Sequence, residues 1–346
     1  MALWKISAAK LLASGAVGKI CKGVAPCSPR ARKKSTSGCP LVGGAGEGQR
    51  RLVGLDGSCN IDLVLRLDRA PTAGETRIAR SLSLHNGGKG ANQAVAASRA
   101  GAQVRLLGGL GQDPYGDRLY QALTTEGIDL SALSWSQLPT GTACIFVEDS
   151  GDNRIAIYPG ANRDIPLANL ETQIAGASHV LAQLEVDPQL VTAAARICRA
   201  QRITFVLNAS PAAEISPELL ALADILLVNA EEAAQILGAS VSSAMEAAAR
   251  LAQGRQAAII TLGKDGAAWA NATGQGCLPA HPVAVEDSTG CGDAFAGVLV
   301  AALAAGATLP TAIARANAAA ALTATALGAQ DAMPSRLAID QFLASQ

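Results

Sequence analysis

A short glycine-rich segment near the C-terminal end carries residue types suited to phosphoryl transfer. Residues 287–293 read Asp-Ser-Thr-Gly-Cys-Gly-Asp and precede an apolar run. This pattern predicts a turn leading into a helix, whose first N–H groups lack intrahelical acceptors and lie at the positive end of the helix dipole. Such an end binds phosphate. We therefore expect an anion to contact the amides of Gly290, Cys291 and Gly292.

Asp293 places a carboxylate where that phosphate would bind. This is unfavourable for binding alone, but it suits a general base that takes a proton from an attacking hydroxyl. Asp is also a common helix cap, and in an isolated motif the cap is the more frequent explanation. The thiol of Cys291 could be reactive beside such a site, or only its backbone could matter.

The elements that would position these groups begin at Arg51, where apolar runs of β type start to alternate with Ala-rich helical stretches. The runs cover residues 52–55, 104–107, 180–184, 203–207, 225–228 and 257–262. Apolar strands between helices predict a parallel sheet covered on both faces. Polar residues or glycines follow each run, and ligands bind at the carboxyl ends of such strands.

Two segments break this rhythm because they alternate polar and apolar residues. They are residues 62–67 with 76–84, and residues 142–158, with a hairpin turn at 149–152. We expect antiparallel strands of a small separate sheet. This sheet would be a lid, formed by about residues 62–84 and 140–158, that excludes water from phosphoryl transfer.

Composition separates residues 1–50 from the rest of the 346-residue chain. Of 28 basic and 28 acidic residues, the first 50 hold nine basic and one acidic, which leaves 19 basic and 27 acidic. We predict a disordered basic extension over 1–50 and one domain over 51–346. The extension resembles an organelle transit peptide, and a wrongly assigned start codon is equally compatible.

The mildly acidic remainder argues against a nucleic-acid partner. No apolar run reaches the length of a membrane span. Eight cysteines without CxxC pairs favour a reduced, cytoplasmic protein, although organelle targeting by residues 1–50 stays open. A Walker A motif, a full dinucleotide fingerprint after the first strand and a nucleophile elbow are all missing from the sequence.

Two motifs together resemble the signatures of the ribokinase-like (PfkB-type) carbohydrate kinases. One is Asn-Gly-Gly-Lys-Gly-Ala-Asn-Gln-Ala at residues 86–94, and the other is the segment 287–293. The resemblance runs from about Leu52 to Phe342, with shorter motifs in the expected order at 57–62, 140–141, 160–162, 229–232, 261–263 and 328–330. It implies a three-layer α/β/α sandwich with a mainly parallel sheet and a small β-sheet lid.

The resemblance implies ATP-dependent phosphorylation of a sugar's terminal hydroxymethyl, with D-ribose as the first candidate. Asp293 would be the base, and the backbone of Gly290, Cys291 and Gly292 would form an anion hole for the γ-phosphoryl group. The residues expected to contact the sugar are Asn60, Asp62, Gly88, Lys89, Asn92, Glu185 and Asp293. The open alternatives are an Asx turn for Asn60 and Asp62 and a solvated surface side chain for Lys89.

The family pattern also implies nucleotide and metal positions. The ATP groove would be lined by Asn229, Thr261, Gly263, Gly266, Gly292 and Asn317. Glu232, with Asn229, would serve Mg²⁺ through water, or it would be an ordinary first-turn helix acid. A monovalent cation, K⁺, would bind Asp287 and the carbonyls of Thr289, Thr323, Ala326 and Gly328. Ala332 stands where the family usually has a Ser ligand, so this site would be weaker or completed by water.

Three further expectations concern substrate, activity and assembly. The same fold could instead phosphorylate deoxyribose, a ketohexose or a nucleoside. A catalytically silent regulator that binds sugar or nucleotide is a third possibility. The lid strands are expected to pair with a second copy of the chain, which would give a homodimer.

Overall fold

A nine-stranded sheet forms the centre of the computed structural model, which describes residues 52–346 except 213–214 and 239–242. The extension predicted for residues 1–50 lies outside the described residues. Across the sheet, the strands are β13 (Gly274–Leu278), β12 (Ala267–Asn271), β11 (Ala257–Thr261), β10 (Ile225–Asn229), β9 (Thr204–Asn208), β8 (Ala177–Ala182), β1 (Leu52–Asp56), β4 (Gln103–Gly111) and β5 (Leu133–Ser136).

Every neighbouring pair from β11 to β5 is parallel, and β12 and β13 continue the sheet in antiparallel pairing. The parallel strands are apolar on both faces; Leu226, Leu227 and Val228 of β10 are all buried. This burial requires cover on each side of the sheet. The predicted parallel sheet is therefore confirmed, while β5, β12 and β13 add strands that the apolar runs did not indicate.

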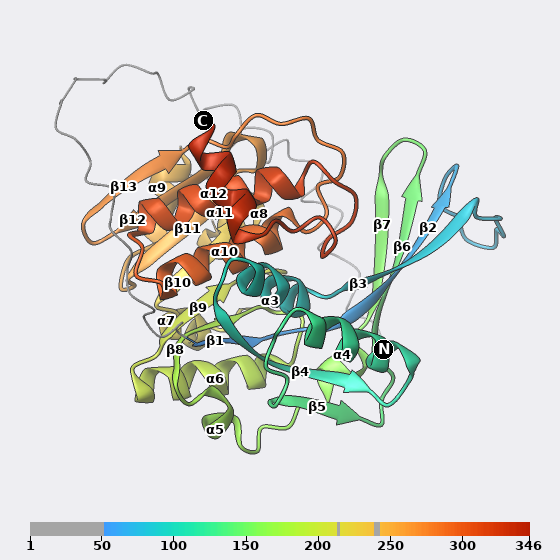
Figure 1. Cartoon of the computed structure of the whole chain (residues 1–346), viewed down its shortest axis with the longest axis horizontal. Helices are drawn as coiled ribbons and strands as arrows, with labels where there is room; N and C mark the ends of the chain where they lie inside the picture. Colours follow the sequence, from blue (N-terminus) through green and yellow to red (C-terminus); the bar gives the residue numbers. More distant parts are fainter. Residues whose placement is uncertain (1–51, 213–214, 239–242) are drawn as a thin grey trace.

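Helices supply that cover in two layers (Figure 1). One layer contains α3 (Lys89–Arg99), α4 (Pro114–Thr125), α10 (Cys291–Ala304) and α11 (Leu309–Thr323), with α12 (Arg336–Ala344) packed on α10 and α11. The other contains α5 (Leu170–Ile174), α6 (Pro188–Gln201), α7 (Pro217–Leu222), α8 (Ala230–Leu237) and α9 (Ala244–Leu251). Within the described part of the chain, no helix is both long and apolar enough to cross a membrane.

Small residues let α3 and α10 approach closely. A Cβ on Gly297 would lie 2.5 Å from the carbonyl oxygen of Gln93, so only glycine fits at this crossing. Buried alanines on both helices keep the remaining contact short, among them Ala94, Ala97 and Ala294. This close packing holds the start of α3 against the start of α10.

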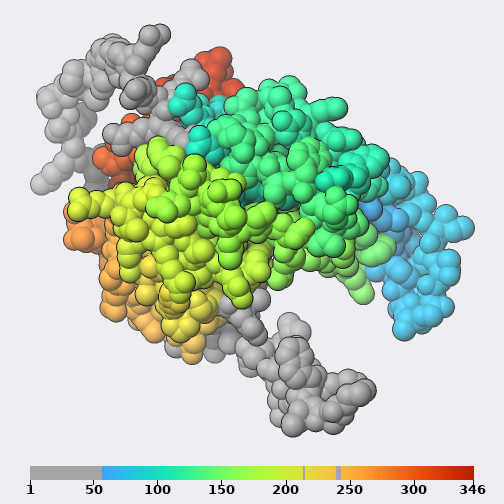
Figure 2. Space-filling model, turned by 90° about the horizontal axis from the view of Figure 1, so that it is seen from below, coloured from blue at the N-terminus to red at the C-terminus, as the bar shows by residue number. Residues whose placement is uncertain are grey.

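A separate four-stranded sheet, called the lid from here on, projects from one end of the body (Figures 1 and 2). In order, it contains β3 (Ser81–Gly87), β2 (Asn60–Leu67), β6 (Gly141–Glu148) and β7 (Asn153–Tyr158). The expected hairpin turn lies between β6 and β7. The prediction of purely antiparallel strands was wrong, because β2 and β6 pair in parallel. β6 reaches β2 by a long crossover rather than a turn, and residues 76–80 lie outside β3.

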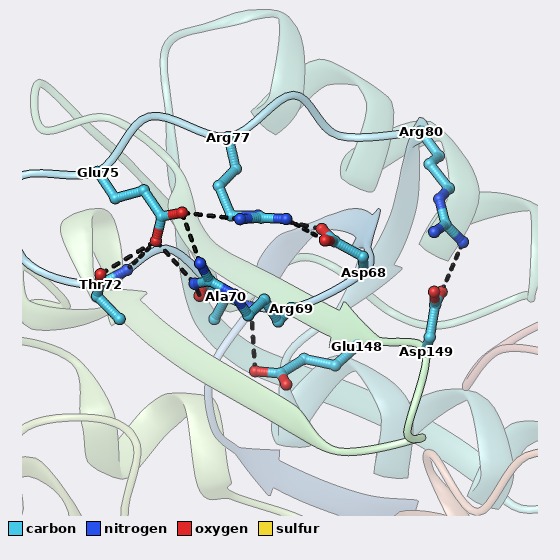
Figure 3. A network of polar contacts seen from close by, with 9 residues as sticks. All are labelled: Asp68, Arg69, Ala70, Thr72, Glu75, Arg77, Arg80, Glu148 and Asp149. Atoms are coloured by element: carbon cyan, nitrogen blue, oxygen red, sulfur yellow. Dashed lines mark hydrogen bonds and ion pairs between the residues drawn. The ribbon is translucent and has the colours of Figure 1, made fainter.

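The connection between β2 and β3 is tied to the lid by a polar network (Figure 3). Glu75 accepts hydrogen bonds from Arg69 and Arg77 at 2.7 Å, and Arg77 also pairs with Asp68. The backbone N–H of Ala70 donates to Glu148 of β6 at 3.1 Å. A further ion pair joins Arg80 to Asp149 at 2.7 Å. These contacts connect the loop after β2 to the end of the β6–β7 hairpin.

Candidate active site

Polar side chains gather at the carboxyl ends of the parallel strands, as the sequence predicted. From β1 the chain extends the sheet towards β4 and β5, and later it returns on the other side of β1 as β8. Open α/β sheets bind ligands at such a switch point. A cavity of about 190 Å³ lies past the ends of β9, β10 and β11, and its lining includes Lys89, Asn229, Glu232, Thr261, Gly292 and Asp293.

The start of α10 faces this cavity. Gly290 precedes the helix with a left-handed backbone (φ 77°), and no side chain caps the helix. A Cβ on Gly290 would lie 2.9 Å from Cα of Ala329, so the turn requires glycine. Asp293 therefore does not act as the helix cap. Its carboxylate accepts hydrogen bonds from Asn92 Nδ2 and Gln93 Nε2, each at 2.9 Å, while Asp293 is only 8% exposed.

The predicted anion hole is only partly open in this structure. The N–H of Cys291 donates to the carbonyl of Ser288 at 3.3 Å, so this amide is engaged within the turn. No protein atom lies within 4 Å of a Cβ built on Gly292, which lines the cavity. Burial, together with Asp287 and Asp293, raises the pKa of the Cys291 thiol to about 11. The thiol is therefore protonated at neutral pH, which does not favour a reactive Cys291.

Three carboxylates surround the lysine at the start of α3. The pKa of Asp62 is raised to about 7 by burial, then by the negative charges of Glu185 and Asp293. Burial alone would lower the pKa of Lys89, but Asp293, Glu185 and Glu232 raise it above its ordinary value. Lys89 is thus a cation held among carboxylates, not a solvated surface side chain. The cluster presents acceptors and donors for a polyol.

The sugar-side residues predicted from the sequence lie together around this cluster. Asn60 and Asp62 lie in β2, not in an Asx turn. Asn162 Nδ2 donates to Asn60 Oδ1 at 2.8 Å, which fixes the orientation of the Asn60 amide. Gly88 precedes α3 with φ 88°, and a Cβ there would lie 2.7 Å from the backbone N of Asn60. Glycine at 88 therefore lets α3 begin directly against β2.

Glu185 is held in place by two donors. Ser58 Oγ donates to Glu185 Oε2 at 2.5 Å, and the backbone N–H of Lys89 donates to the same oxygen at 3.3 Å. Glu185 follows β8, Ser58 follows β1 and Lys89 begins α3. One carboxylate oxygen thus joins three elements at the sheet edge.

On the nucleotide side, Asn229 and Glu232 form a reciprocal capping box at the start of α8. Asn229 Oδ1 accepts from the Glu232 N–H, and Glu232 Oε2 accepts from the Asn229 N–H, both at 2.8 Å. Glu232 is therefore a first-turn acid with a structural role, and it also lines the cavity. Mg²⁺ usually takes one or two carboxylates alongside water and phosphate, so a single carboxylate at this position fits that ion.

The other predicted nucleotide residues lie at two places. Thr261 lines the cavity with Asn229 and Gly292, whereas Gly263, Gly266 and Asn317 are not part of its lining. Asn317 Nδ2 donates to the carbonyls of Leu278 and Pro279, each at 3.2 Å, and Gly266 packs against the same segment. Asn317 and Gly266 therefore contact the segment that follows β13, outside the cavity lining.

The predicted monovalent-cation residues lie on two segments, one before α10 with Asp287 and Thr289, and one at the end of α11 with Thr323, Ala326 and Gly328. Asp287 accepts from the N–H and hydroxyl of Thr289, and its other oxygen accepts from the Gly328 N–H at 3.0 Å. The carbonyl of Thr323 accepts from the N–H of Ala326 at 3.3 Å. Carboxylate and carbonyl oxygens are ligands for hard cations, but in this structure both Asp287 oxygens and the Thr323 carbonyl already accept hydrogen bonds from the protein. No cluster of three or more His, Cys, Asp or Glu suited to a metal occurs in the residues described.

Several site residues were missed at the sequence level. Gln93 contacts Asp293 directly, and Asn162 and Ser58 orient Asn60 and Glu185. Asn208 and Ser210 also line the cavity. A signal for Gln93 was present, since positions 89, 92 and 93 lie on one helix face. Ser58 and Asn162 lie within the short motifs at 57–62 and 160–162, but no role was assigned to them because their partners come from distant segments.

Comparison with known proteins agrees with this geometry. A sequence profile described as pfkB family carbohydrate kinase matches residues 52–336. This chain belongs to the pfkB family of carbohydrate kinases. A ribokinase from Bacillus subtilis is 36% identical over 292 residues, which cover 83% of this chain and 97% of the relative. A ribokinase from Haemophilus influenzae is 36% identical over 302 residues, covering 85% and 99%.

Solved structures show the same architecture. A structure of Arabidopsis thaliana ribokinase complexed with ribose and ATP matches with a TM-score of 0.78 at 29% identity, covering 85% of this chain and 98% of that chain. The ribokinase-like α/β fold expected from the motifs is therefore confirmed. As a pfkB-family kinase, the chain has its two signature motifs at the starts of α3 and α10, which meet at Asp293.

Proposed function

We propose that this chain transfers the γ-phosphoryl group of ATP to the terminal hydroxymethyl of D-ribose, giving D-ribose 5-phosphate and ADP. The observation that carries the proposal is the position of Asp293. This carboxylate stands at the uncapped start of α10, on the cavity, and within the charge cluster of Asp62, Lys89 and Glu185. The ribokinases it resembles support ribose as the acceptor.

In the proposed reaction, Asp293 accepts the proton of the sugar hydroxyl as that oxygen attacks the γ-phosphorus of ATP. The bond from phosphorus to the bridging oxygen breaks, and ADP leaves. The Gly292 N–H and the positive end of α10 stabilise the charge on the transferred group. Asn60, Asp62, Lys89 and Glu185 hold the sugar, so catalysis depends mainly on positioning and electrostatics.

Mg²⁺ would bind on the nucleotide side near Glu232 and Asn229, where it would neutralise phosphate charge. The capping box leaves the Glu232 carboxylate fixed at the cavity wall. Turnover should stop when EDTA removes the ion and return on addition of excess Mg²⁺. Undiminished turnover in EDTA would exclude this part of the proposal.

K⁺ would bind the loop of Asp287 and the carbonyls near Gly328, next to the anion-binding turn. Ala332 offers no hydroxyl there, so we expect activation weaker than a complete ligand set would give. Rates measured in K⁺ and in a large organic cation at equal ionic strength test this. Equal rates would remove K⁺ from the account.

The lid is proposed to mediate a homodimer. In the lid sheet, Leu65 of β2 pairs with Leu82 of β3 and with Phe146 of β6, so the three side chains lie on one face of the sheet. The side chain of Asp62 points to the other face of the sheet. Leu82 is 59% exposed, and an apolar surface of this kind favours burial against a second copy. Light scattering at micromolar concentration should report a dimer that Leu82→Glu dissociates. A monomeric wild-type protein would contradict this assembly.

The cytoplasm is the proposed compartment. A fluorescent fusion at the C-terminus should fill the cytoplasm. Sequestration in an organelle would favour a targeting role for residues 1–50, and mass spectrometry of the native N-terminus would then show whether they are removed.

A panel of acceptors tests the proposed function directly. Purified protein with MgATP would be given D-ribose, 2-deoxyribose, fructose and a nucleoside, with ADP release coupled to a spectroscopic readout. We expect D-ribose to give the highest kcat/KM and the product mass of ribose 5-phosphate. A higher kcat/KM for another acceptor would reassign the substrate, and binding of ribose without any ADP release would indicate a silent regulator.

A further inference from the structure

The proposed base is held by two buried side-chain amides of α3. Asn92 Nδ2 donates to Asp293 Oδ2, and Gln93 Nε2 donates to Asp293 Oδ1, each at 2.9 Å. Gln93 is completely buried and Asn92 is 6% exposed. Both carboxylate oxygens are therefore fixed from the protein side. The lone pairs left over are those available to a hydroxyl in the cavity.

Each of these amides is itself held by another glutamine. Gln183 Nε2 donates to Gln93 Oε1, and Gln330 Nε2 donates to Asn92 Oδ1 at 3.0 Å. An ionised carboxylate only accepts hydrogen bonds, so the NH₂ groups of Asn92 and Gln93 must face Asp293. Their oxygens must then face outward and need donors. The direction of all four amides follows from the charge on Asp293.

The series of hydrogen bonds from Asp293 through Gln93 to Gln183 ends at an oxygen atom that has no hydrogen-bond donor. Gln183 Oε1 is buried and has no hydrogen-bond partner among the described residues. A Cβ on Gly57 would lie 1.9 Å from this oxygen, so glycine at 57 makes room for it. A buried acceptor without a donor is costly. The hydrogen bonds of Gln183 itself do not account for a glutamine at this position, because its Oε1 has no donor. Its donation to Gln93 does account for it.

We propose that Gln93, oriented by Gln183, is a positioning residue that aims the Asp293 carboxylate at the acceptor hydroxyl. This inference rests on the proposed function, because it assumes that Asp293 is the base. Gln93 touches neither substrate in this account. Its effect on the reaction passes through the orientation and charge of Asp293, as expected for a buried network of charge-assisted hydrogen bonds.

Gln93→Met tests the proposal, because it keeps the length of the side chain and removes the donor. Loss of a hydrogen bond to a charged group should lower kcat by about tenfold to a hundredfold, while the Kd of ribose and the KM of ATP change by less than about twofold. Val95→Ala is the matched control on α3. Val95 is buried, so this variant should lower Tm and leave kcat unchanged.

Gln183→Met provides an independent second variant. It removes the unsatisfied Oε1 but leaves Gln93 Oε1 without its donor, so the number of unmatched buried acceptors stays the same. We expect a Tm shift of only a few degrees and a kcat reduced several-fold, with ribose affinity retained. This variant decides the question if Gln93→Met does not fold.

The outcomes separate the two levels of the account. Wild-type protein that turns over no sugar would contradict the proposed function itself. If wild type is active, a folded Gln93→Met or Gln183→Met variant with kcat within twofold of the wild-type value would overturn the positioning role. A higher KM with unchanged kcat would also overturn it, as would an equal decrease of kcat in Val95→Ala. A kcat-specific loss in the Met variants supports it.

Discussion

Single residues in this site derive their properties from burial and from each other's charge. Burial, followed by the negative charges of Glu185 and Asp293, raises the pKa of Asp62 to about 7. Asp293, Glu185 and Glu232 raise the pKa of Lys89 above its ordinary value. The cluster would be unfavourable if it stayed closed to polar ligands. A bound sugar would supply hydroxyl donors to these carboxylates, and this explains why they collect at one point.

The raised pKa of Asp62 predicts that ribose affinity depends on pH near neutrality. If the sugar needs ionised Asp62, with its pKa at about 7, the Kd should increase about tenfold between pH 8 and pH 6. For the free protein the sign is opposite, because protonation of Asp62 favours the folded state. That stabilisation is complete below about pH 3.8 and is lost as the pH rises through about 7.

Calorimetric titration of ribose from pH 5.5 to 8.5 measures this dependence. Asp62→Asn is the control, since it should bind more weakly and with a flat profile over the same range. A wild-type Kd that does not vary with pH would show that Asp62 is not the group that limits sugar binding.

Gly292 allows a second prediction for a single residue. A Cβ added there meets no protein atom within 4 Å, so Gly292→Ala should fold normally, but its methyl group would project into the space proposed for the phosphate. Displacement of the reacting group by about 1 Å can cost about a hundredfold. We therefore expect kcat/KM for ATP to fall at least about tenfold, with ribose binding retained.

Gly274→Ala is the matched control, because its Cβ also meets no atom within 4 Å and it lies in β13, outside the cavity lining. This variant should keep wild-type kinetics. Equal kinetics for Gly292→Ala and wild type would remove the start of α10 from the phosphate site.

Among the secondary-structure elements, the strands with a clear local pattern of apolar residues were predicted correctly from the sequence. The six apolar runs became β1, β4, β8, β9, β10 and β11, because buried parallel strands are apolar on both faces. The same rule could not find β5, or β12 and β13 at the sheet edge, which are short and rich in small or polar residues. The parallel pairing of β2 with β6 was not predicted. Alternating polar and apolar residues show which side chains share a face of a strand, but not which strand it pairs with.

Site prediction divided in the same way. Residues within the two motifs, such as Lys89 and Asp293, were located from the sequence and meet in the structure. Ser58, Asn162 and Gln183 were not assigned roles, because their importance depends on contacts over 90 to 127 residues of sequence. Such distant contacts follow from topology rather than from local pattern.

The lid carries the prediction at this scale. Arg69, Thr72 and Arg77 hold the pKa of Glu75 well below its usual range, so the network around Glu75 should persist at pH 5 and fail only in stronger acid. Glu75→Gln should speed amide hydrogen exchange across residues 68–80 and leave β6 and β7 unchanged. Because these groups are exposed, high salt should have a similar but smaller effect on wild type.

Unchanged exchange in Glu75→Gln would mean that the loop is held by its backbone contacts instead. Glu171→Gln is a suitable control, since Glu171 lies in α5, outside the lid, and its side chain accepts an exposed hydrogen bond of 3.3 Å from Gln201 Nε2. It should leave exchange over residues 68–80 at the wild-type rate.

For the molecule as a whole, the two halves of the chain supply different halves of the site. The residues proposed for the sugar side lie between Ser58 and Glu185, and those proposed for the nucleotide side and the base lie between Asn229 and Gly328. The two halves of the site meet where α3 packs on α10. There Asn92 and Gln93 donate hydrogen bonds to Asp293, which is about 200 positions away in the sequence. In the proposed reaction the fold itself would align the reacting groups, and Asn60 and Asp62 of lid strand β2 would complete the sugar side.

The central claim is that the Asp293 carboxylate takes the proton from the sugar hydroxyl. The most direct measurement compares Asp293→Asn with wild type, by single-turnover formation of ribose 5-phosphate from MgATP and by calorimetric binding of ribose. For Asp293→Asn we expect a rate lower by about 10²–10⁴-fold, with ribose affinity within a few-fold of wild type. An Asn variant that turns over at the wild-type rate would contradict it.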